Sequence, residues 1–387
     1  MKIVVATSGR FHALDLAREL GAREHQVLFY SDLLPSRTRR FGLPSSCART
    51  FFPFTWPFVW GARHHWNRAQ RERWDHFGTL IRERLLLRRL PPCDVFISMA
   101  GLFTQVGRVA RQRGARWIIE RGSRHVLSQK EILAAVPSTP RPAYGASPVS
   151  SFYETRNLIE YEEADLIAVP SRHAAESFVE RGYPREKLFV NPYGVDLAMF
   201  PPTSPPGGPV PVVLFVGTWS WQKGVDILVE AVRCLPMPVR LIHVGAIAEG
   251  PPLPKESWFM HVDPVSQWNL KTWYAQGDLF ALASRQEGLA LVQAQAMACG
   301  LPLVCTDRTG GEDLAELLKP VGHQWVRVVP AGDPKPFSQA LADTIGRIRS
   351  DSPLVPRDRL GSLRGRLGWT AYGERYDSFL RERFSHV

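Results

Sequence analysis

Short apolar runs alternate with helix-forming stretches along almost the whole chain, and this alternation limits the possible fold more than any other feature. Apolar runs separated by helices are typical of parallel sheets built from βαβ units. The alternation is interrupted at residues 200–209, Phe-Pro-Pro-Thr-Ser-Pro-Pro-Gly-Gly-Pro. Proline fixes φ and removes an amide donor, so neither a helix nor a strand ladder can continue through this segment. The sequence therefore predicts two α/β units of similar size joined by a proline-rich hinge.

The expected elements divide between the two units. Strands of the first unit are expected at residues 2–6, 26–30, 94–98, 116–120, 166–169 and 188–191. Strands of the second unit are expected at 212–216, 240–244, 279–283, 302–306 and 325–329. Helices are expected at 13–20, 151–163, 224–233, 290–298 and 369–384. Because ligands of such sheets bind beyond the carboxyl ends of the strands, two facing sheets would form a binding cleft between them.

The 387 residues, of which 44% are hydrophobic and 22% charged, are ordinary globular material and fit two or three domains. The chain begins with an expected strand, so no signal peptide is expected. No apolar run is long enough for a transmembrane helix, which needs about 18 residues. The five cysteines are scattered and form no C-x-x-C pair, which favours reduced thiols in a cytoplasmic protein over metal ligation.

The chain is basic, with a net charge of +11, and much of this charge lies in residues 37–89, where twelve arginines accompany three acidic residues. Aromatic residues are interleaved at 51–60, a run too short and too rich in proline to span a bilayer. This mixture suits an anionic membrane surface, although a solvated helix face with ordinary core aromatics explains it equally well. Since no nucleic-acid-binding motif accompanies the charge, nucleic acid is not an expected partner.

The first chemical motif is the segment 215–226, in which an expected strand ends at Gly217 and Lys223-Gly224 opens an expected helix. The lysine supplies positive charge, the glycine allows close backbone approach, and the free amide groups of a helix N-terminus point outward. These features favour a phosphate site. A surface lysine at a helix start is the simpler alternative.

The second chemical motif is the segment 283–302, in which an apolar strand runs into a polar turn. Glu287-Gly288 then opens a helix rich in small residues, which Gly300 ends. A carboxylate before a helix can be merely an N-cap. Two phosphate-compatible helix starts in one unit, with a carboxylate between cleft and helix, nevertheless favour a nucleoside diphosphate ligand.

In combination these segments resemble glycosyltransferase family four, whose members mostly retain anomeric configuration. The hallmark of that family is a pair of glutamates separated by seven residues and followed by Ala-Met-Ala-Cys-Gly. Glu287 matches the first glutamate, the tail matches at residues 296–300, and Lys223 matches the phosphate-binding lysine of the family. Segments 191–200 and 309–313 resemble the family's pre-hinge segment and its glycine-containing loop. The resemblance covers most of the chain and implies transfer of a sugar from a nucleoside-diphosphate donor to an acceptor.

The fold implied by the resemblance is the α/β fold called GT-B, in which two Rossmann-like domains face each other across a cleft. The expected acceptor-binding domain is residues 1–200, and the expected hinge is 201–209. The expected nucleotide-sugar-binding domain is residues 210–367. Residues 368–387 are expected to form a C-terminal helix that returns to the first domain.

The resemblance also implies roles for individual residues. Glu287 would contact the hydroxyl groups of the donor sugar, Lys223 would contact the diphosphate, and the loop at Gly9 would approach the phosphates from across the cleft. His125 resembles a histidine placed against the transferred sugar, and both His12 and His125 are candidates for binding the acceptor. The implied catalytic residues are Lys223, Glu287 and His125. The implied donor-binding residues are Gly9, Gly217, Thr218, Lys223, Glu287, Gly288, Leu289 and Gln295.

Two positions depart from the family pattern. Gln295 stands where the second glutamate would accept hydrogen bonds from the ribose, and Thr218 stands where an arginine is often found. Glutamine keeps one carbonyl acceptor but loses charge assistance, a difference of roughly 0.5–2 kcal/mol. Donor binding is therefore expected to be weaker by roughly a few-fold to thirtyfold. Lys223 and the helix termini would hold the diphosphate, with Arg285 as a further candidate.

The chain contains no D-x-D motif, so metal-independent transfer without a cofactor is expected. The resemblance implies a same-face displacement in which the leaving phosphate helps to deprotonate the acceptor. A saccharide or lipid-linked acceptor would fit a role in surface polysaccharide or lipopolysaccharide assembly, at the inner face of the cytoplasmic membrane. The alternatives are a non-catalytic subunit that binds nucleotide sugar or glycolipid, and a GT-B sugar-nucleotide epimerase.

Overall fold

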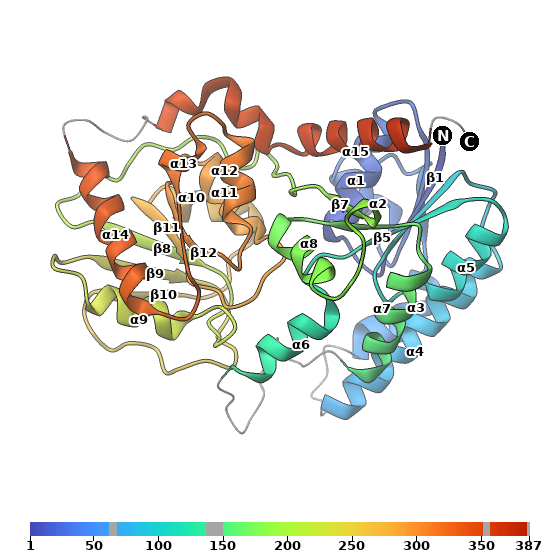
Figure 1. Ribbon diagram of the computed structural model, residues 1–387, viewed down its shortest axis with the longest axis horizontal. Coiled ribbons are helices and arrows are strands. Elements are labelled where there is room, and N and C mark those ends of the chain that lie inside the picture. Colours follow the sequence, from blue (N-terminus) through green and yellow to red (C-terminus); the bar gives the residue numbers. More distant parts are fainter. Residues whose placement is uncertain (62–67, 137–149, 351–356, 385–387) are drawn as a thin grey trace.

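The chain folds into two α/β units, each built around one parallel sheet (Figure 1). The computed structural model describes residues 1–61, 68–136, 150–350 and 357–384. The first sheet has the strand order β3-β2-β1-β4-β5-β6-β7, and the second has the order β10-β9-β8-β11-β12-β13. In both sheets the chain starts near the middle, so the carboxyl ends of β1 and β8 lie at central positions. The predicted α/β fold with two Rossmann-like units is confirmed.

The first unit contains the segments before the proline-rich residues. Its strands are β1 (Lys2–Ala6), β2 (Gln26–Ser31), β3 (Ala48–Thr50), β4 (Val95–Met99), β5 (Arg116–Glu120), β6 (Leu166–Val169) and β7 (Leu188–Val190). Its helices are α1 (Phe11–Gly21), α2 (Pro35–Arg40), α3 (Phe52–Gly61), α4 (Arg68–Leu87), α5 (Thr104–Gln112), α6 (Val126–Ala134), α7 (Ser151–Glu163) and α8 (Arg172–Val179). A short 3-10 helix, η1 (Arg185–Lys187), precedes β7.

The second unit follows residues 201–209, to which the structure assigns neither helix nor strand. Its strands are β8 (Val212–Val216), β9 (Arg240–Val244), β10 (Phe259–Val262), β11 (Leu279–Leu282), β12 (Leu303–Thr306) and β13 (Val326–Val329). Its helices are α9 (Val225–Arg233), α10 (Leu270–Tyr274), α11 (Leu291–Ala298), α12 (Gly311–Leu317), α13 (Gly322–Trp325) and α14 (Pro334–Arg349). The 3-10 helices η2 (Gln267–Asn269) and η3 (Arg357–Leu367) complete it, and α15 (Trp369–Phe384) ends the described chain.

Two edge strands, β3 and β10, were not expected from the sequence. Each lies at the outer edge of its sheet and is only partly buried. Edge strands need no continuous apolar run, because one side of the strand is not covered by a neighbour. By contrast, all five residues of β8 are buried. This strand shows the unbroken apolar pattern of a parallel strand that is covered on both faces.

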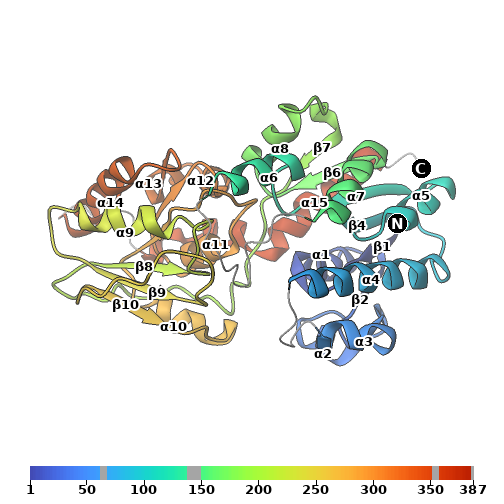
Figure 2. The same ribbon diagram turned by 90° about the horizontal axis from the view of Figure 1, so that it is seen from below.

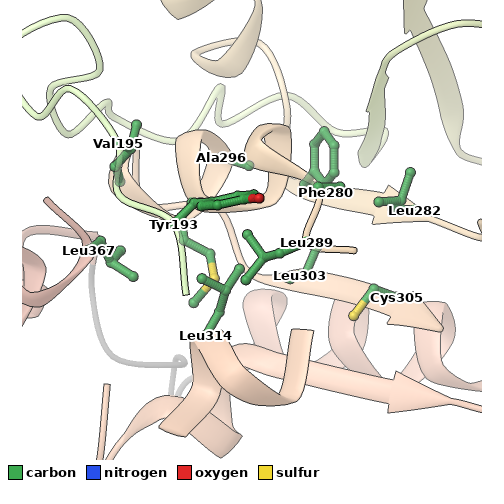
Figure 3. Close-up of a cluster of buried hydrophobic side chains, with 14 of the residues drawn as sticks. Tyr193, Val195, Phe280, Leu282, Leu289, Ala296, Leu303, Cys305, Leu314 and Leu367 are labelled. Atoms are coloured by element: carbon green, nitrogen blue, oxygen red, sulfur yellow. The ribbon is translucent and has the colours of Figure 1, made fainter. Parts of the chain in front are cut away.

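The two units share a hydrophobic core where the chain passes between them. Figure 3 shows Tyr193, Val195 and Leu367 beside side chains of the second unit. The amide of Val195 donates to the carbonyl of Leu367 over 2.8 Å. At Gly194 a Cβ would lie 2.6 Å from the backbone of Trp369, so only glycine allows the two segments to pass this closely. The crossing is therefore built by backbone contact as well as by apolar burial.

Helix α15 returns to the first unit and packs against α1 (Figure 1). Its Tyr376 hydroxyl donates to Glu120 over 2.7 Å, and its Asp377 accepts from His25 over 2.7 Å. Gly373 lets the helix approach α1 closely, because a Cβ there would lie 2.4 Å from that of Glu19. The last helix of the chain thus completes the fold of the first unit, as expected from the sequence.

Candidate functional site

The carboxyl ends of β8 and β11 bring the two sequence motifs together. The Lys223 ammonium contacts a carboxylate oxygen of Glu287, and the Ser284 hydroxyl donates to the same oxygen over 2.8 Å. Both charged side chains keep some exposure, 22% for Lys223 and 13% for Glu287. The pair is therefore held in a fixed arrangement and still reaches solvent.

A tight turn places Lys223 beside Glu287. Gly224 is left-handed, with φ of 64°, and serves as the N-cap of α9. A Cβ at this position would lie 2.0 Å from the carbonyl oxygen of Ala283, at the end of β11. Glycine is needed here for both its conformation and its size.

Arg285 braces the same turn and is not available for a diphosphate, contrary to the sequence-based suggestion. Its guanidinium donates to both carboxylate oxygens of Asp226, over 2.7 and 2.6 Å, and to the carbonyl of Trp221 over 2.7 Å. A bidentate pair of this kind fixes the guanidinium in one orientation. Lys223 is thus the cation at this site that can contact a diphosphate.

Gly217 and Thr218 begin the loop that follows β8, and both are partly buried. The Gly217 carbonyl accepts a hydrogen bond from His243 over 2.9 Å. Burial lowers the pKa of His243 to about 4, so the ring is neutral at physiological pH. Gly245 packs directly behind, since a Cβ there would lie 2.0 Å from the Gly217 oxygen. The start of the loop is therefore rigid.

The loop at Glu287-Gly288 is pressed against the first unit. The Ser171 hydroxyl donates to the carbonyl of Gly288 over 2.7 Å, and His173 donates to the carbonyl of Glu287 over 3.1 Å. A Cβ at Gly288 would lie 2.1 Å from the carbonyl oxygen of Gly122. Helix α11 begins at Leu291, one residue after the expected start at residue 290 and three residues after Gly288. Glu287 and Gly288, which precede the helix, contact the first unit instead.

Gln295 lines a cavity of about 160 Å³ between the two units, together with His12. Its carbonyl oxygen already accepts a hydrogen bond from the buried Tyr274 hydroxyl over 2.9 Å. From the sequence, this oxygen is expected to accept a hydrogen bond from the ribose. One of the two lone pairs of this oxygen is engaged by the protein, which leaves the second lone pair as an acceptor and the NH2 group of Gln295 as a donor.

His12 lies at the start of α1 and reaches the same cavity. Its Nε2 donates to Glu120 over 2.9 Å, and its ring stacks on Tyr193 with 4.3 Å between centroids. The preceding residues Gly9 and Arg10 are partly buried, and Arg10 donates across to Gln267 of the second unit over 2.9 Å. The structure therefore brings the Gly9 loop and His12 to the boundary between the units.

His125 is not brought to that cavity, and the structure gives its predicted catalytic and acceptor-binding roles no support. Its ring is buried among Tyr161, Phe178 and Tyr183, and its Nδ1 accepts from the amide of Leu127. Burial lowers the pKa of His125 to about 3. The residue caps α6 from within the core of the first unit.

Sequence reasoning missed the carboxylate of Glu120. This residue ends β5, is almost fully buried, and accepts from both His12 and Tyr376. A carboxylate that ends an apolar strand at the carboxyl edge of a parallel sheet was the available signal. Its partners could not be foreseen, because they lie on α1 and on the last helix.

Among the described residues, no group of three or more His, Cys, Asp and Glu side chains is arranged to hold a metal ion. No helix in the described part of the chain is both long and apolar enough to cross a membrane. The predicted roles of Lys223, Glu287, Gly9, Gly217, Thr218, Gly288, Leu289, Gln295 and His12 stay predictions.

Two family models match the chain one after the other. The model described as glycosyl transferase 4-like domain matches residues 9–194, and the model described as glycosyl transferases group 1 matches residues 210–347. Together they cover most of both units. The chain belongs to the family-four-like glycosyltransferases.

Curated relatives match over part of their length. The D-inositol 3-phosphate glycosyltransferase of Xylanimonas cellulosilytica is 31% identical over 235 residues, which are 53% of this chain and 54% of that protein. The putative colanic acid biosynthesis glycosyltransferase WcaL of Escherichia coli is 26% identical over 224 residues, 51% of this chain and 52% of that protein. The chain thus matches about half the length of these relatives.

Solved structures of this GT-B glycosyltransferase fold match over the full length. Sucrose-phosphate synthase from Thermosynechococcus elongatus has a TM-score of 0.66 at 20% identity and covers 100% of both chains. Alr3699/HepE of Anabaena, in complex with UDP and glucose, has a TM-score of 0.65 at 15% identity and covers 99% of this chain and 100% of its own. At such identities the likeness shows the fold.

Proposed function

We propose that this glycosyltransferase-family protein transfers a sugar from a nucleoside-diphosphate donor to a saccharide or glycolipid acceptor. The observation that carries the proposal is the contact of Lys223 with Glu287, which Ser284 orients, at the carboxyl ends of two central strands. A cation and a carboxylate side by side complement the diphosphate and the sugar hydroxyls of such a donor. The HepE structure with UDP and glucose, which has this fold, supports the choice of donor class.

The chemistry follows from where charge develops. Cleavage of the anomeric bond leaves negative charge on the departing diphosphate, and an ammonium fixed in a cleft stabilises it. Lys223 has three N–H donors, so it can hold Glu287 and a phosphate oxygen at the same time. Glu287, oriented by Ser284, would accept hydrogen bonds from the sugar. The leaving phosphate would deprotonate the acceptor on the same face, which gives transfer with retention and without a metal.

The acceptor side is proposed to lie at the His12–Glu120 pair. This pair faces the cavity that Gln295 lines from the second unit. A histidine hydrogen-bonded to a buried carboxylate is held in one tautomer and one orientation. Such a ring is suited to binding a sugar hydroxyl beside the donor.

A glycolipid acceptor at an anionic membrane is supported by the surface of α3 and α4. Exposed apolar side chains on these helices are Phe54, Trp56, Trp74, Phe77 and Leu80. Exposed arginines accompany them, and Arg89 lies over the ring of Phe54 at 5.8 Å. Not every arginine of the basic stretch contributes, because Arg82 is buried in a bidentate pair with Asp32. Residues 62–67 of that stretch, including Arg63, lie outside the described residues.

We therefore place the activity at the inner face of the cytoplasmic membrane, in surface polysaccharide or lipopolysaccharide assembly. Anionic vesicles should sediment the protein at low salt and release it at high salt. Phe77→Ser should weaken sedimentation several-fold. Met260→Ser, which changes an exposed apolar residue of the second unit, should leave it unchanged. No sedimentation at any salt concentration would leave a soluble acceptor as the better proposal.

The experiment for the donor site is calorimetric titration with UDP, GDP, dTDP and ADP, without added metal. One of these should bind, and Lys223→Ala should weaken that binding about 10- to 100-fold, because a charge-assisted bond is lost. Lys271→Ala, at an exposed lysine of α10, is the matched control and should bind normally. Binding without turnover of the matching nucleotide sugar would favour the non-catalytic subunit, and turnover without an acceptor to another sugar nucleotide would favour the epimerase.

A further inference from the structure

A second cavity, of about 350 Å³, lies between the two units on another side of the Glu287 loop. The first unit contributes residues from just before α6, from within α6 and from the segment directly after α8. The second unit contributes Arg308, in the turn between β12 and α12. Figure 2 shows α6 and α8 at this boundary. The charged residues of the lining are Arg124, Arg181, Arg308, Glu131 and Glu180.

One side chain of the lining, Arg124, is a buried guanidinium whose N–H groups have few hydrogen-bond partners. The side chain of Arg124 is 7% exposed, and its Nε has no hydrogen-bond partner among the described residues. Its other contacts are long, 3.3 Å to the carbonyl of His173 and 3.6 Å to the carboxylate of Glu180. Burial and the positive charge of Arg308 both lower the pKa of Arg124. A buried guanidinium with an unused donor and like-charged neighbours needs a negative partner.

The two carboxylates of the lining do not fill that need. Glu180 and Glu131 are 63% and 67% exposed, so each can turn into solvent at little cost. Glu131 is bound to Arg181 over 2.6 Å, at the rim of the cavity. Outside the lining, Asp307 makes a long contact of 3.7 Å with Arg308 and is 45% exposed. Within the lining, three guanidinium groups from both units face two carboxylates.

We propose that this cavity binds a phosphate group, which would link Arg124 and Arg181 of the first unit to Arg308 of the second. Guanidinium groups match the oxygens of phosphate in geometry and charge. The volume accommodates inorganic phosphate and also the phosphate of a small phosphomonoester. The site is separate from the Lys223–Glu287 pair and does not depend on the proposed function.

The cavity is connected to the donor site through the backbone of Glu287. The amide of Glu287 donates to the carbonyl of Arg308 over 3.0 Å, and the carbonyl of Glu287 accepts from His173. His173 in turn is held by Arg124. A phosphate bound by both Arg124 and Arg308 would therefore restrain Arg308 and His173, the two residues that hydrogen-bond the backbone of Glu287. This consequence rests on the proposed function: phosphate and nucleoside diphosphate should each tighten binding of the other by the same factor.

The test measures binding of inorganic phosphate without any nucleotide, by calorimetry and by the thermal midpoint, with chloride at equal ionic strength as the reference. All measurements are made in the Lys223→Ala background as well, since phosphate could also occupy the donor site. We expect binding to persist in Lys223→Ala and to weaken at least tenfold in Arg308→Gln. Arg308 is 40% exposed, so its replacement should leave the fold intact.

Arg327→Gln, at an exposed arginine on β13, is the matched control and should bind phosphate normally. Glucose 6-phosphate provides the second arm. Tighter binding than inorganic phosphate would identify a phosphomonoester as the ligand class, and equal binding would identify free phosphate. The proposal is overturned if phosphate stabilises no more than chloride does, or if the effect disappears in Lys223→Ala and survives in Arg308→Gln.

Discussion

The two halves of the cleft are built in different ways. In the second unit, Lys223, Ser284 and Glu287 follow directly on two adjacent strands and are held by short turns. In the first unit, His12 is oriented by Glu120, which also accepts from Tyr376 on the last helix. The proposed donor side thus joins two turns that are 64 residues apart and follow adjacent strands, whereas the proposed acceptor side joins segments separated by 108 and 256 residues. Substitutions can separate the two.

The largest effect is expected from Gly224→Ala, which attacks the local turn. A methyl group there would meet the Ala283 carbonyl and would also need a left-handed conformation. We expect a loss of roughly 2–5 kcal/mol in the free energy of unfolding, together with loss of nucleotide binding. Gly207→Ala is the control, because Gly207 has φ of 66° but nothing within 4 Å. It should cost roughly 1 kcal/mol in urea denaturation, and equal costs for the two variants would contradict the steric explanation.

His12→Gln tests whether the acceptor side is separable from the donor side. The variant should bind nucleoside diphosphate normally in calorimetry, while transfer to acceptor slows about tenfold or more, since a positioned proton-transfer or binding group is lost. The control is His323→Gln, at an exposed histidine of α13. Weaker nucleotide binding in His12→Gln would show that the two halves are not independent.

Gln295→Glu tests whether residue 295 binds the ribose of the donor nucleotide. One carboxylate oxygen would keep the Tyr274 hydroxyl, and the other would become a charged acceptor for the ribose. Nucleotide affinity should therefore rise by roughly 3- to 30-fold, measured by titration. Gln339→Glu, on the exposed face of α14, should have no such effect. Unchanged affinity in Gln295→Glu would mean that the ribose binds elsewhere.

The smallest effect is expected at His125, and it concerns stability. The folded protein keeps this ring neutral, with a pKa near 3, whereas the unfolded chain takes up a proton below about 6.5. The neutral His125 ring therefore makes its full contribution to the free energy of unfolding above pH 6.5. This contribution is lost as the pH falls from 6.5 toward 3. In urea denaturation, His125→Asn should reduce the loss between pH 7 and pH 5 by roughly 1 kcal/mol, after allowance for solvent screening. Slower transfer with unchanged stability would restore a catalytic role.

The sequence predicted what is local. Each strand end and helix start around Lys223 and Glu287 lies within a few residues, so the pattern of apolar runs and glycines was sufficient. The burial of His125 could not be predicted, because its apolar neighbours Tyr161 and Phe178 come from elements 36 residues or more away in the chain. The hydrogen bond from Tyr274 to the Gln295 carbonyl oxygen could not be predicted for the same reason, since Tyr274 lies on another helix. Edge strands β3 and β10 escaped because half-exposed strands carry no continuous apolar signal.

The return of α15 has a consequence for how the chain is made. Glu120 is separated from its partner Tyr376 by 256 residues, and the whole second unit is synthesised between them. The first unit is synthesised early, and His12 can already bind one oxygen of Glu120, but α1 and the other oxygen gain their partners only after α15 has been made. Its nascent form therefore stays incompletely packed until residues 369–384 have been synthesised.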